Sequence, residues 1–423
     1  MLVIGCIVGV GIFRTASSIA GHLPSPMLIL LLWAAGGLIS LCGALCYAEL
    51  AALFPSTGGD YVYITKVYGR FWGFLFGWTK LFIERTGTIA ILGYVFAEYM
   101  RTLVPFDHTA LRWVAAAAVV LLTVVNVIGV RCGLWVQNVF TALKIVALAT
   151  LIGIGIWSAS LGAVQPGWSL PPLNFSVLQS MGVAFVFVLW TYGGWTEAAY
   201  VAGEVRSPAR TVPRAILGGL AFTTVLYLLV NWSYLAVLPV ASLAATPLVA
   251  SKVAQLAWGR AGASFIACMI ACSAFGALNG YILTGGRILY AMGRDHPMFV
   301  RLGTVHPDFR TPTRALWANA AMAAGLIFTK TFDQIMTYST VVISVFFIMA
   351  VFSVVILRWQ RGRAPRKALA WGYPVTPLLF CVTMGGFIIN VCVKEPGEAA
   401  FGFVLLAVGV PLYYWSHRRR RHR

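Results

Sequence analysis

The feature that most constrains this chain is the recurrence of long apolar stretches along its 423 residues. Sixty per cent of the residues are hydrophobic, only 10% are charged, and the mean hydropathy is +0.84. A helix needs roughly 20 apolar residues to cross the hydrocarbon core of a bilayer. Because such stretches recur from end to end, the sequence predicts an all-α polytopic membrane protein with one transmembrane domain and no soluble domain for an active site.

The formal charge of +19 would suit a nucleic-acid-binding protein, but the cations are distributed as in a membrane protein. With the N-terminus placed in the cytoplasm, 21 of the 31 lysines and arginines fall on the predicted cytoplasmic side. This bias follows the positive-inside rule and predicts that both termini are cytoplasmic. We therefore expect the lipid bilayer as a partner and no nucleic acid. The basic tail, 416–423, is predicted to lie at the anionic leaflet surface.

About twelve transmembrane helices can be drawn along the chain. Five fall in a first group, 1–160, and five in a second group, 177–358, and two additional helices follow in 373–415. The first and sixth spans hold corresponding positions in the two groups, and each is interrupted near its middle. Paired interruptions of this kind indicate an inverted-repeat transporter.

The two interruptions are glycine pairs inside apolar segments. The first is Gly9-Val10-Gly11-Ile12-Phe13, and the second is Tyr192-Gly193-Gly194-Trp195. Each glycine lowers helix propensity by roughly 1 kcal/mol, and a broken helix persists in lipid only where it lines a cavity. Free N–H groups then attract an anion and free carbonyls attract a cation, which suits a zwitterion. Only eight residues precede Gly9, so either the chain continues upstream or its inner half-helix is short.

The third and fifth predicted spans contain charged residues deep inside them: Lys80, Glu84 and Arg85 in the third, and Lys144 in the fifth. A charge at the bilayer centre costs roughly 2.5–3.5 kcal/mol on insertion scales unless it is paired or hydrated. Lys80 and Glu84 are four residues apart, so an ion pair along one helix face is predicted.

Four motifs together carry a resemblance to a known family: Gly9-Val10-Gly11-Ile12-Phe13, Cys46-Tyr47-Ala48-Glu49-Leu50, Pro55-Ser56-Thr57-Gly58-Gly59-Asp60-Tyr61 and Ser273-Ala274-Phe275-Gly276-Ala277-Leu278-Asn279-Gly280. The chain resembles the amino acid–polyamine–organocation superfamily, and within it the L-type amino-acid transporter branch. The resemblance implies a leucine-transporter-type fold, a five-plus-five inverted repeat with two further helices, that works by alternating access.

The resemblance implies a substrate-binding set on the two breaks: Ile7, Gly9, Val10, Gly11, Trp190, Gly193, Thr196 and Glu197. The backbone N–H groups of Val10 and Gly11 would hold the substrate carboxylate. The carbonyls of Ile7, Trp190 and Gly193 would hold its ammonium. Trp190 matches the aromatic gate over the substrate, with core packing as the alternative. The family often has serine where Val10 stands, so a side-chain hydroxyl is absent here.

Lys144 matches a lysine that takes the place of a sodium ion in sodium-independent relatives; alternatively it snorkels or pairs elsewhere. Glu197 departs from the L-type pattern, which has a neutral polar residue there. Exchangers of basic amino acids carry their glutamate one position earlier, at Thr196. Glu197 could recognise a cationic side chain, bind a coupling proton, or pair with a cation such as Arg14. A fixed charge at Arg14 argues against a cationic substrate.

The sequence thus predicts a sodium-independent permease that exchanges neutral L-amino acids, with no catalytic residues, metal or cofactor. Alternatives are a basic amino-acid or polyamine antiporter, a proton-coupled symporter, and a sensor that binds amino acid without transporting it. An enzyme is disfavoured because the spans hold no H-E-x-x-H or G-x-S-x-G motif. A channel is disfavoured because a broken-helix zwitterion site binds its substrate instead of forming a wet pore.

Animal relatives pair with a single-pass heavy chain through a cysteine between the third and fourth spans. The corresponding loop, 101–112, contains no cysteine, so no disulfide-linked heavy chain is expected. The arginine-rich composition and short termini suggest a prokaryotic inner membrane.

Overall fold

The computed structural model contains helices and no strand within the residues that it describes. These residues are 7–54, 59–107, 109–128, 133–161, 170–172, 174–196, 208–295, 299–361 and 370–420. Nine of the described helices are long and apolar enough to cross a membrane. The predicted all-α polytopic architecture is confirmed.

The other three predicted spans are present as shorter or divided helices. α2 (Gly11–His22) starts at the first break and has only 12 residues. The third span is divided into α5 (Arg70–Thr79), the π-helical turn η1 (Lys80–Arg85) and α6 (Thr86–Leu103). α14 (Thr313–Thr329) has 17 residues. The described helices therefore account for all twelve predicted spans.

The helices group into two compact units, each assembled from separate stretches of the chain. The first unit comprises 1–76, 148–249 and 343–396, and the second comprises 77–147, 250–342 and 397–423. Both predicted five-helix groups contribute to both units, so the units are not the repeats. The division into repeats stays a prediction.

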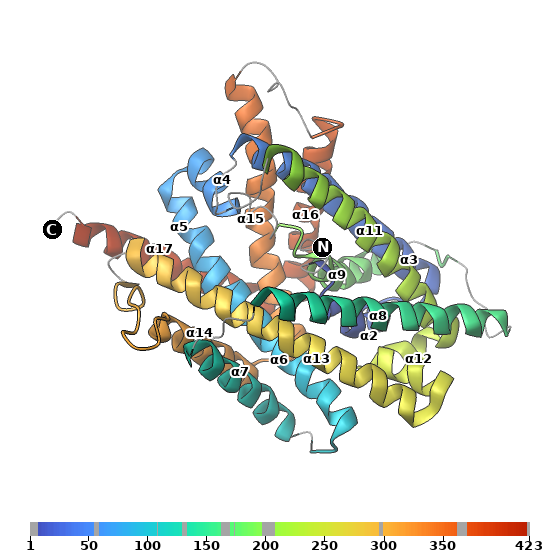
Figure 1. The fold of residues 1–423 in the computed structure, drawn as a ribbon. Coiled ribbons are helices and arrows are strands. Elements are labelled where there is room, and N and C mark those ends of the chain that lie inside the picture. The colour runs from blue at the N-terminus through green and yellow to red at the C-terminus, as the bar shows by residue number, and fades with distance from the viewer. Residues whose placement is uncertain are drawn as a thin grey trace. The chain divides into compact units, whose positions relative to one another are not determined.

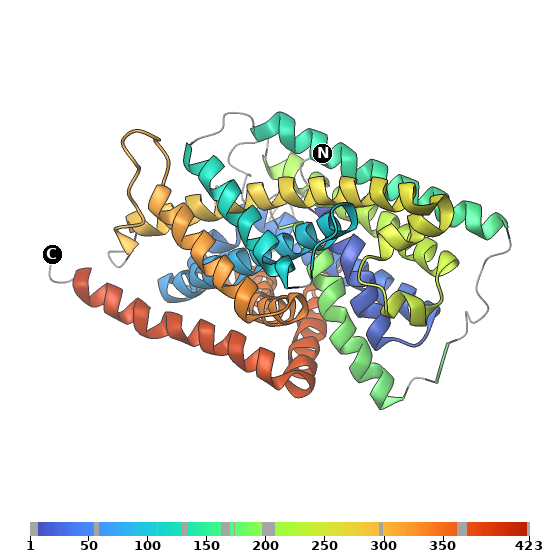
Figure 2. The same ribbon diagram turned by 90° about the horizontal axis from the view of Figure 1, so that it is seen from below.

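The first unit holds both glycine breaks. Its complete helices are α2, α3 (Pro26–Leu53), α4 (Gly59–Tyr68), α9 (Phe175–Tyr192), α11 (Pro208–Val237), α12 (Val240–Ala244) and α16 (Val375–Lys394). α3 starts with proline at its first turn, where the missing N–H costs no helical hydrogen bond. α3 and α11 run side by side (Figure 1), and α2 packs against α9 and α12 (Figure 2). These contacts position α2 and α9 for the site described below.

The second unit holds η1 and the complete helices α6, α7 (Ala110–Ile128) and α14, which pack against one another (Figure 1). Tyr94 on α6 approaches the carbonyls of Ile327 and Lys330 at the end of α14, at 2.6 and 2.8 Å. The last carbonyls of a helix receive no hydrogen bond from an N–H of the same helix, so the Tyr94 hydroxyl supplies a donor that they lack. Asn126 on α7 donates to Asn279 at 2.7 Å.

Three helices continue from one unit into the other: α5, α8 (Gly133–Ser160) and α15 (Phe332–Arg361). α13 (Val249–Asp295) and α17 (Pro396–Arg420) lie in the second unit apart from their first residue. α13 consists of two helical parts, because Trp258 and Gly259 have non-helical angles and Gly259 has φ +65°. Sequence patterning did not predict the first part of α13 or the five-residue α12, because neither is long enough to show a membrane span.

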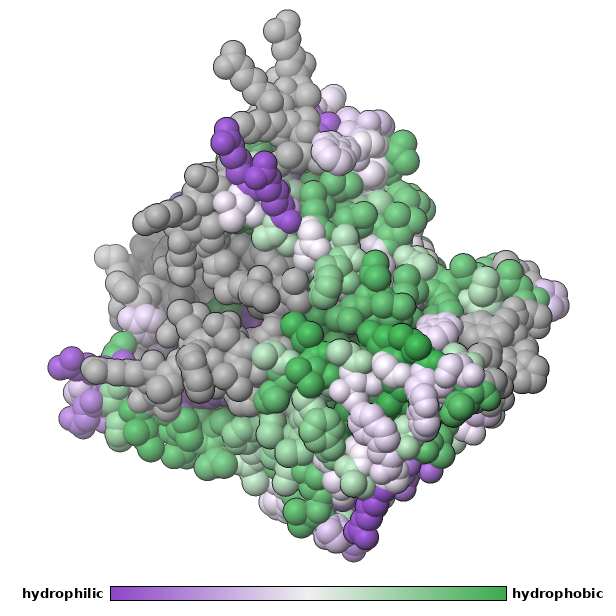
Figure 3. Space-filling view, turned by 45° about the vertical axis from the view of Figure 1, so that its right-hand side comes forward, coloured by the Kyte–Doolittle hydropathy of each residue, from purple (hydrophilic) through white to green (hydrophobic). Residues whose placement is uncertain are grey.

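Large apolar side chains are exposed on many helices. They include Trp113, Ile156, Phe175, Val225, Val382 and Val404, each more than half exposed. Apolar residues also predominate on the described part of the face in Figure 3. A water-soluble protein rarely exposes so much contiguous apolar surface, whereas lipid solvates it. The chain is a multi-pass membrane protein.

Candidate functional site

The first break lies just before α2. Val10, at the N-cap of this helix, has φ −78° and ψ −11°, and the helix begins at Gly11. The N–H of Gly9 donates to the carbonyl of Ile7 at 2.7 Å, and the N–H of Phe13 donates to that of Val10 at 3.1 Å. The first N–H groups of a helix have no intrahelical acceptor. The predicted carboxylate donors, Val10 and Gly11, therefore lie where backbone N–H groups are available.

The second break ends α9 at Tyr192. Gly193 caps the helix, and its N–H donates to the carbonyl of Trp190 at 3.0 Å. Gly194 has φ +96°, a conformation that glycine adopts at no steric cost. The chain then turns through Trp195 and Thr196, which are both buried. Glu197 lies outside the described residues, and its predicted roles stay predictions.

The two breaks lie directly against one another. A Cβ atom placed on Gly11 would lie 2.8 Å from Cζ3 of Trp190 and 2.9 Å from Oγ1 of Thr191. Both distances are shorter than a Cβ atom can accept, so a glycine is needed where α2 meets the end of α9. A Cβ on Gly9 would find no atom nearer than 3.8 Å. The two glycines of the motif thus have different roles: Gly11 permits contact, and Gly9 interrupts the helix.

Tyr227 on α11 links the two breaks, and sequence analysis missed it. This fully buried side chain places its hydroxyl 2.9 Å from the carbonyl of Ile7 and 3.2 Å from that of Thr191. One hydroxyl hydrogen is thus shared between a carbonyl of each broken segment. Tyrosine usually lies at the membrane interfaces. A tyrosine in the middle of the seventh span was the available sequence signal.

Three aromatic rings next to the breaks form a compact cluster. Tyr227, Trp33 and Tyr192 have ring centroids 5.3 to 5.7 Å apart. The hydroxyl of Tyr192 also donates to the carbonyl of Trp33 at 3.0 Å. Aromatic pairs at such distances stabilise by about 0.5–1.5 kcal/mol beyond the area they bury. The cluster joins α3, α9 and α11, and so fixes the end of α9.

Two of the predicted ammonium-binding carbonyls already accept hydrogen bonds. The carbonyl of Ile7 accepts from Gly9 and Tyr227, which uses both of its lone pairs. The carbonyl of Trp190 accepts from Gly193, which leaves capacity for one more donor. An ammonium bound at Ile7 must therefore replace the Tyr227 hydroxyl or the Gly9 amide.

The aromatic side chains at the second break differ in burial. Trp190 is partly exposed, an environment that suits either a gate or simple packing. Trp195 is buried, with its ring 4.8 Å from that of Tyr47 and 6.1 Å from that of Phe347. Trp195 thus anchors the turn to α3 and α15, while the gate assigned to Trp190 stays a prediction.

The predicted cations are both buried. Arg14 lies on α2, within the first turn after Gly11, and is 7% exposed. Lys144 lies on α8, within the second unit, and is 3% exposed. Each makes polar interactions in the structure. The sodium-mimicking role of Lys144 stays a prediction.

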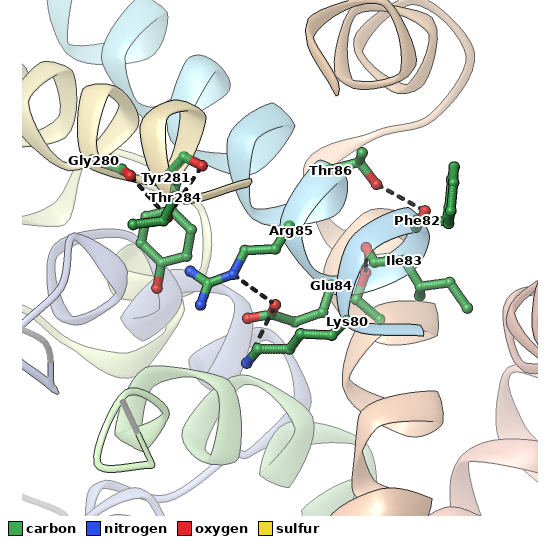
Figure 4. A network of polar contacts seen from close by, with 10 residues as sticks. Lys80, Phe82, Ile83, Glu84, Arg85, Thr86, Gly280, Tyr281 and Thr284 are labelled. Carbon is green, nitrogen blue, oxygen red and sulfur yellow. Dashed lines mark hydrogen bonds and ion pairs between the residues drawn. The ribbon is translucent and has the colours of Figure 1, made fainter. Parts of the chain in front are cut away.

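The three charged residues near the middle of the third span lie on η1, a π-helical turn that the sequence did not predict (Figure 4). Oε2 of Glu84 lies 3.4 Å from Nζ of Lys80 and 3.5 Å from Nε of Arg85. The predicted Lys80–Glu84 ion pair is confirmed, and Arg85 joins it. The Arg85 guanidinium also lies 4.8 Å from the ring centroid of Tyr281.

Two hydroxyls bond carbonyls of the same turn. Ser339 on α15 donates to the carbonyl of Ile83 at 3.3 Å, and Thr86 donates to that of Phe82 at 2.8 Å. π-helical turns shift the helical hydrogen-bond pattern and occur frequently at functional sites. Here the turn gathers three charged side chains while its backbone remains helical.

Within the part of the chain that the structure describes, no three His, Cys, Asp or Glu residues are grouped so that they could hold a metal ion. Among the described residues, those that meet at the two breaks bring together backbone amides, carbonyls and hydroxyls, and Arg14 lies one turn away. A discontinuous pair of helices in a multi-pass protein is the arrangement of a membrane transporter.

Comparison with known proteins identifies the family. The family model described as amino acid permease matches residues 1–415, so the chain belongs to this family. The predicted membership of the amino acid–polyamine–organocation superfamily is confirmed, and the chain is a transporter and not an enzyme.

Curated relatives match along nearly the whole chain. The serine/threonine exchanger SteT of Bacillus subtilis is 32% identical over 99% of this chain and 95% of its own. The human b(0,+)-type amino acid transporter 1 is 31% identical over 98% and 85% of the two chains. The human large neutral amino acids transporter small subunit 2 is 30% identical over 99% and 79%.

Proposed function

We propose that the chain is a sodium-independent exchanger of neutral L-amino acids that works by alternating access. The contact between the two breaks carries this proposal. It places the N–H groups at the start of α2 beside the carbonyls at the end of α9, within one unit. N–H groups suit a carboxylate and carbonyls suit an ammonium, so the pair is complementary to the part that all α-amino acids share.

The substrate-binding residues we propose are those that the sequence predicts. Val10 and Gly11 bind the carboxylate, and Gly9 provides the interruption. Trp190 and Gly193 bind the ammonium through their carbonyls. The Ile7 carbonyl also binds it once the Gly9 amide or the Tyr227 hydroxyl no longer donates to that carbonyl. Trp190 gates the site, and Thr196 and Glu197 contact the substrate side chain.

Sodium independence is supported by Lys144. A buried ammonium in a membrane span must find oxygen ligands, as a sodium ion would. The resemblance implies that the Lys144 ammonium takes the place of a sodium ion, and transport then needs no sodium. Transport in proteoliposomes in sodium-free buffer tests this point directly, and a strict requirement for a sodium gradient would contradict it.

Neutral substrates are supported by Arg14, which is buried one turn from the proposed carboxylate donors. A nearby fixed positive charge repels a cationic side chain. The names of two relatives also specify serine and threonine, or large neutral amino acids, as their substrates. We expect a panel of unlabelled neutral amino acids to compete with a transported label.

A basic amino-acid or polyamine antiporter is the second candidate, because Glu197 could recognise a cationic side chain. A proton-coupled symporter is the third, because Glu197 could instead bind a coupling proton. Replacing Glu197 with glutamine separates them from the neutral exchanger. A neutral exchanger keeps its preference for neutral amino acids and its pH profile, although its affinity for individual substrates changes. A cation antiporter loses recognition of arginine-like competitors, and a proton symporter loses acid stimulation.

We further propose that the chain resides in a prokaryotic inner membrane with both termini in the cytoplasm. The excess of basic residues on the predicted inner side supports this orientation. The absence of cysteine from 101–112 supports function without a disulfide-linked heavy chain, although one relative is named a small subunit. Uptake by the purified chain alone tests this.

A further inference from the structure

A pair of threonine hydroxyls bridges the two broken helices. Thr15 lies on α2, one turn after Gly11, and Thr191 lies on α9, next to Trp190. Their Oγ1 atoms are 3.1 Å apart, and both side chains are buried. The two residues are 176 positions apart in the sequence, so the contact is specific to the folded arrangement.

The two hydroxyls have more acceptors than hydrogens. Oγ1 of Thr15 lies 2.9 Å from the carbonyl of Gly11, and Oγ1 of Thr191 lies 2.6 Å from that of Phe187. Together with the contact between them, two hydrogens serve three hydrogen-bonding distances. One hydroxyl must therefore turn from its own helix to bond the other.

The rotation of either hydroxyl away from its own helix costs little free energy, because the carbonyl that it leaves still accepts a backbone N–H. In an α-helix the carbonyl of residue i accepts the N–H of residue i+4. The carbonyls of Gly11 and Phe187 thus retain the amides of Thr15 and Thr191 when a hydroxyl turns away. The hydrogen bond between the helices can form in either direction without leaving a buried carbonyl unsatisfied.

We propose that Thr15 and Thr191 are positioning residues that fix the spacing between the first and second breaks. This inference rests on the proposed amino-acid site. The carboxylate and ammonium of an α-amino acid are attached to one carbon, so their separation is fixed. A site built on two separate helices can match both groups only if the helices hold a fixed spacing. Displacement of the two halves by about 1 Å is enough to lower activity strongly.

The test uses threonine-to-valine substitutions, which keep the shape and remove the hydroxyl. The variants are Thr15→Val, Thr191→Val and the double variant, with Thr223→Val as the matched control. Thr223 is also buried and bonds the carbonyl four residues before it, at 2.8 Å on α11. Measurements are the KM and kcat of exchange in proteoliposomes, and thermal unfolding of the substrate-free protein in detergent.

We expect each single substitution to raise KM by about threefold to tenfold, the range for one hydrogen bond. The double variant should be no worse than the more affected single variant, because both remove the same bond. Thr15→Ser and Thr191→Ser should restore KM, and Thr223→Val should leave it unchanged. KM values equal to that of the control, or fully additive effects of the two substitutions, would overturn the proposal.

The two measurements separate this inference from the proposed function. If the wild-type protein moves no amino acid while the unfolding temperatures still show coupling between Thr15 and Thr191, the proposed function fails and the hydroxyl bond stands. If the wild-type protein exchanges amino acids and the valine variants match the control, the function stands and the positioning role fails.

Discussion

The first and third membrane spans of this protein are interrupted by opposite means. At Gly9–Gly11 in the first unit the helix stops, and the contacts across the break are made by backbone groups and hydroxyls, with Arg14 one turn away. At Lys80–Arg85 in the second unit the helix continues as a π-helical turn, and the polar groups are charged side chains. In both places a hydroxyl from another helix bonds an interruption carbonyl: Tyr227 bonds Ile7, and Ser339 bonds Ile83.

In our proposal the first of these interruptions binds substrate, and the second supports the structure. Backbone groups freed by glycine carry partial charges of both signs, and in our proposal these groups bind the zwitterion, with the buried Arg14 one turn away. At the π-helical turn, by contrast, two cations share one carboxylate, and these ion pairs hold the charged side chains against the helix. We therefore expect changes at the breaks to alter transport, and changes at the π-helical turn to alter stability.

The largest effect is expected from Gly11→Ala. Its Cβ would collide with Trp190 and Thr191, which would force the two breaks apart. We expect kcat/KM for exchange to fall at least about 100-fold. Gly21→Ala is the control, because it lies on the same helix and a Cβ there meets nothing within 4 Å. Equal activity of the two variants would show that the contact between the breaks is unimportant.

The next effect is expected from Glu84→Gln, which leaves Lys80 and Arg85 without their shared carboxylate. We expect the free energy of unfolding to fall by about 2 kcal/mol, somewhat less than for a fully buried pair because Glu84 is partly exposed. Thermal unfolding in detergent measures this.

Glu398→Gln is the control for that experiment. Its partner Lys330 keeps a second contact, 4.3 Å from the ring centroid of Phe401. A smaller loss of stability is expected there. If Glu84→Gln instead left stability unchanged and shifted the KM for substrate, the π-helical turn would belong to the binding site and the contrast between the two regions would fail.

A third prediction concerns Tyr227→Phe, which removes the hydroxyl shared by the two breaks. We expect the loss of the bridge between the Ile7 and Thr191 carbonyls to outweigh the acceptor position that it frees on Ile7, so that KM rises about tenfold. The unfolding temperature should change little, because the ring cluster with Trp33 and Tyr192 remains. Equilibrium binding and exchange kinetics measure this. A large loss of stability with unchanged KM would make Tyr227 a purely structural residue.

The smallest effect is expected from Ser339→Ala, the counterpart of Tyr227→Phe at the π-helical turn. Loss of one hydrogen bond to the carbonyl of Ile83 should lower the free energy of unfolding by about 0.5–1 kcal/mol and leave KM unchanged. A rise in KM comparable to that of Tyr227→Phe would remove the functional distinction between the two hydroxyls.

The sequence predicted the breaks and the Lys80–Glu84 pair because both have local signals. Glycine pairs interrupt an apolar run visibly, and a spacing of four residues places two charges on one helix face. The sequence did not predict the π-helical turn, because 80–85 contains no glycine or proline to mark a change of helix type. Nor did it predict the hydroxyl contacts of Tyr227 and Thr15, whose partners are 220 and 176 residues away. Such contacts depend on tertiary packing.

Sodium-free exchange of a labelled neutral amino acid in proteoliposomes tests the central claim most directly. The wild-type protein and Gly21→Ala are expected to take up label when unlabelled amino acid is inside, and Gly11→Ala is expected to take up almost none. Uptake that requires sodium, or uptake by Gly11→Ala equal to that of Gly21→Ala, would contradict an amino-acid site formed where the two breaks meet.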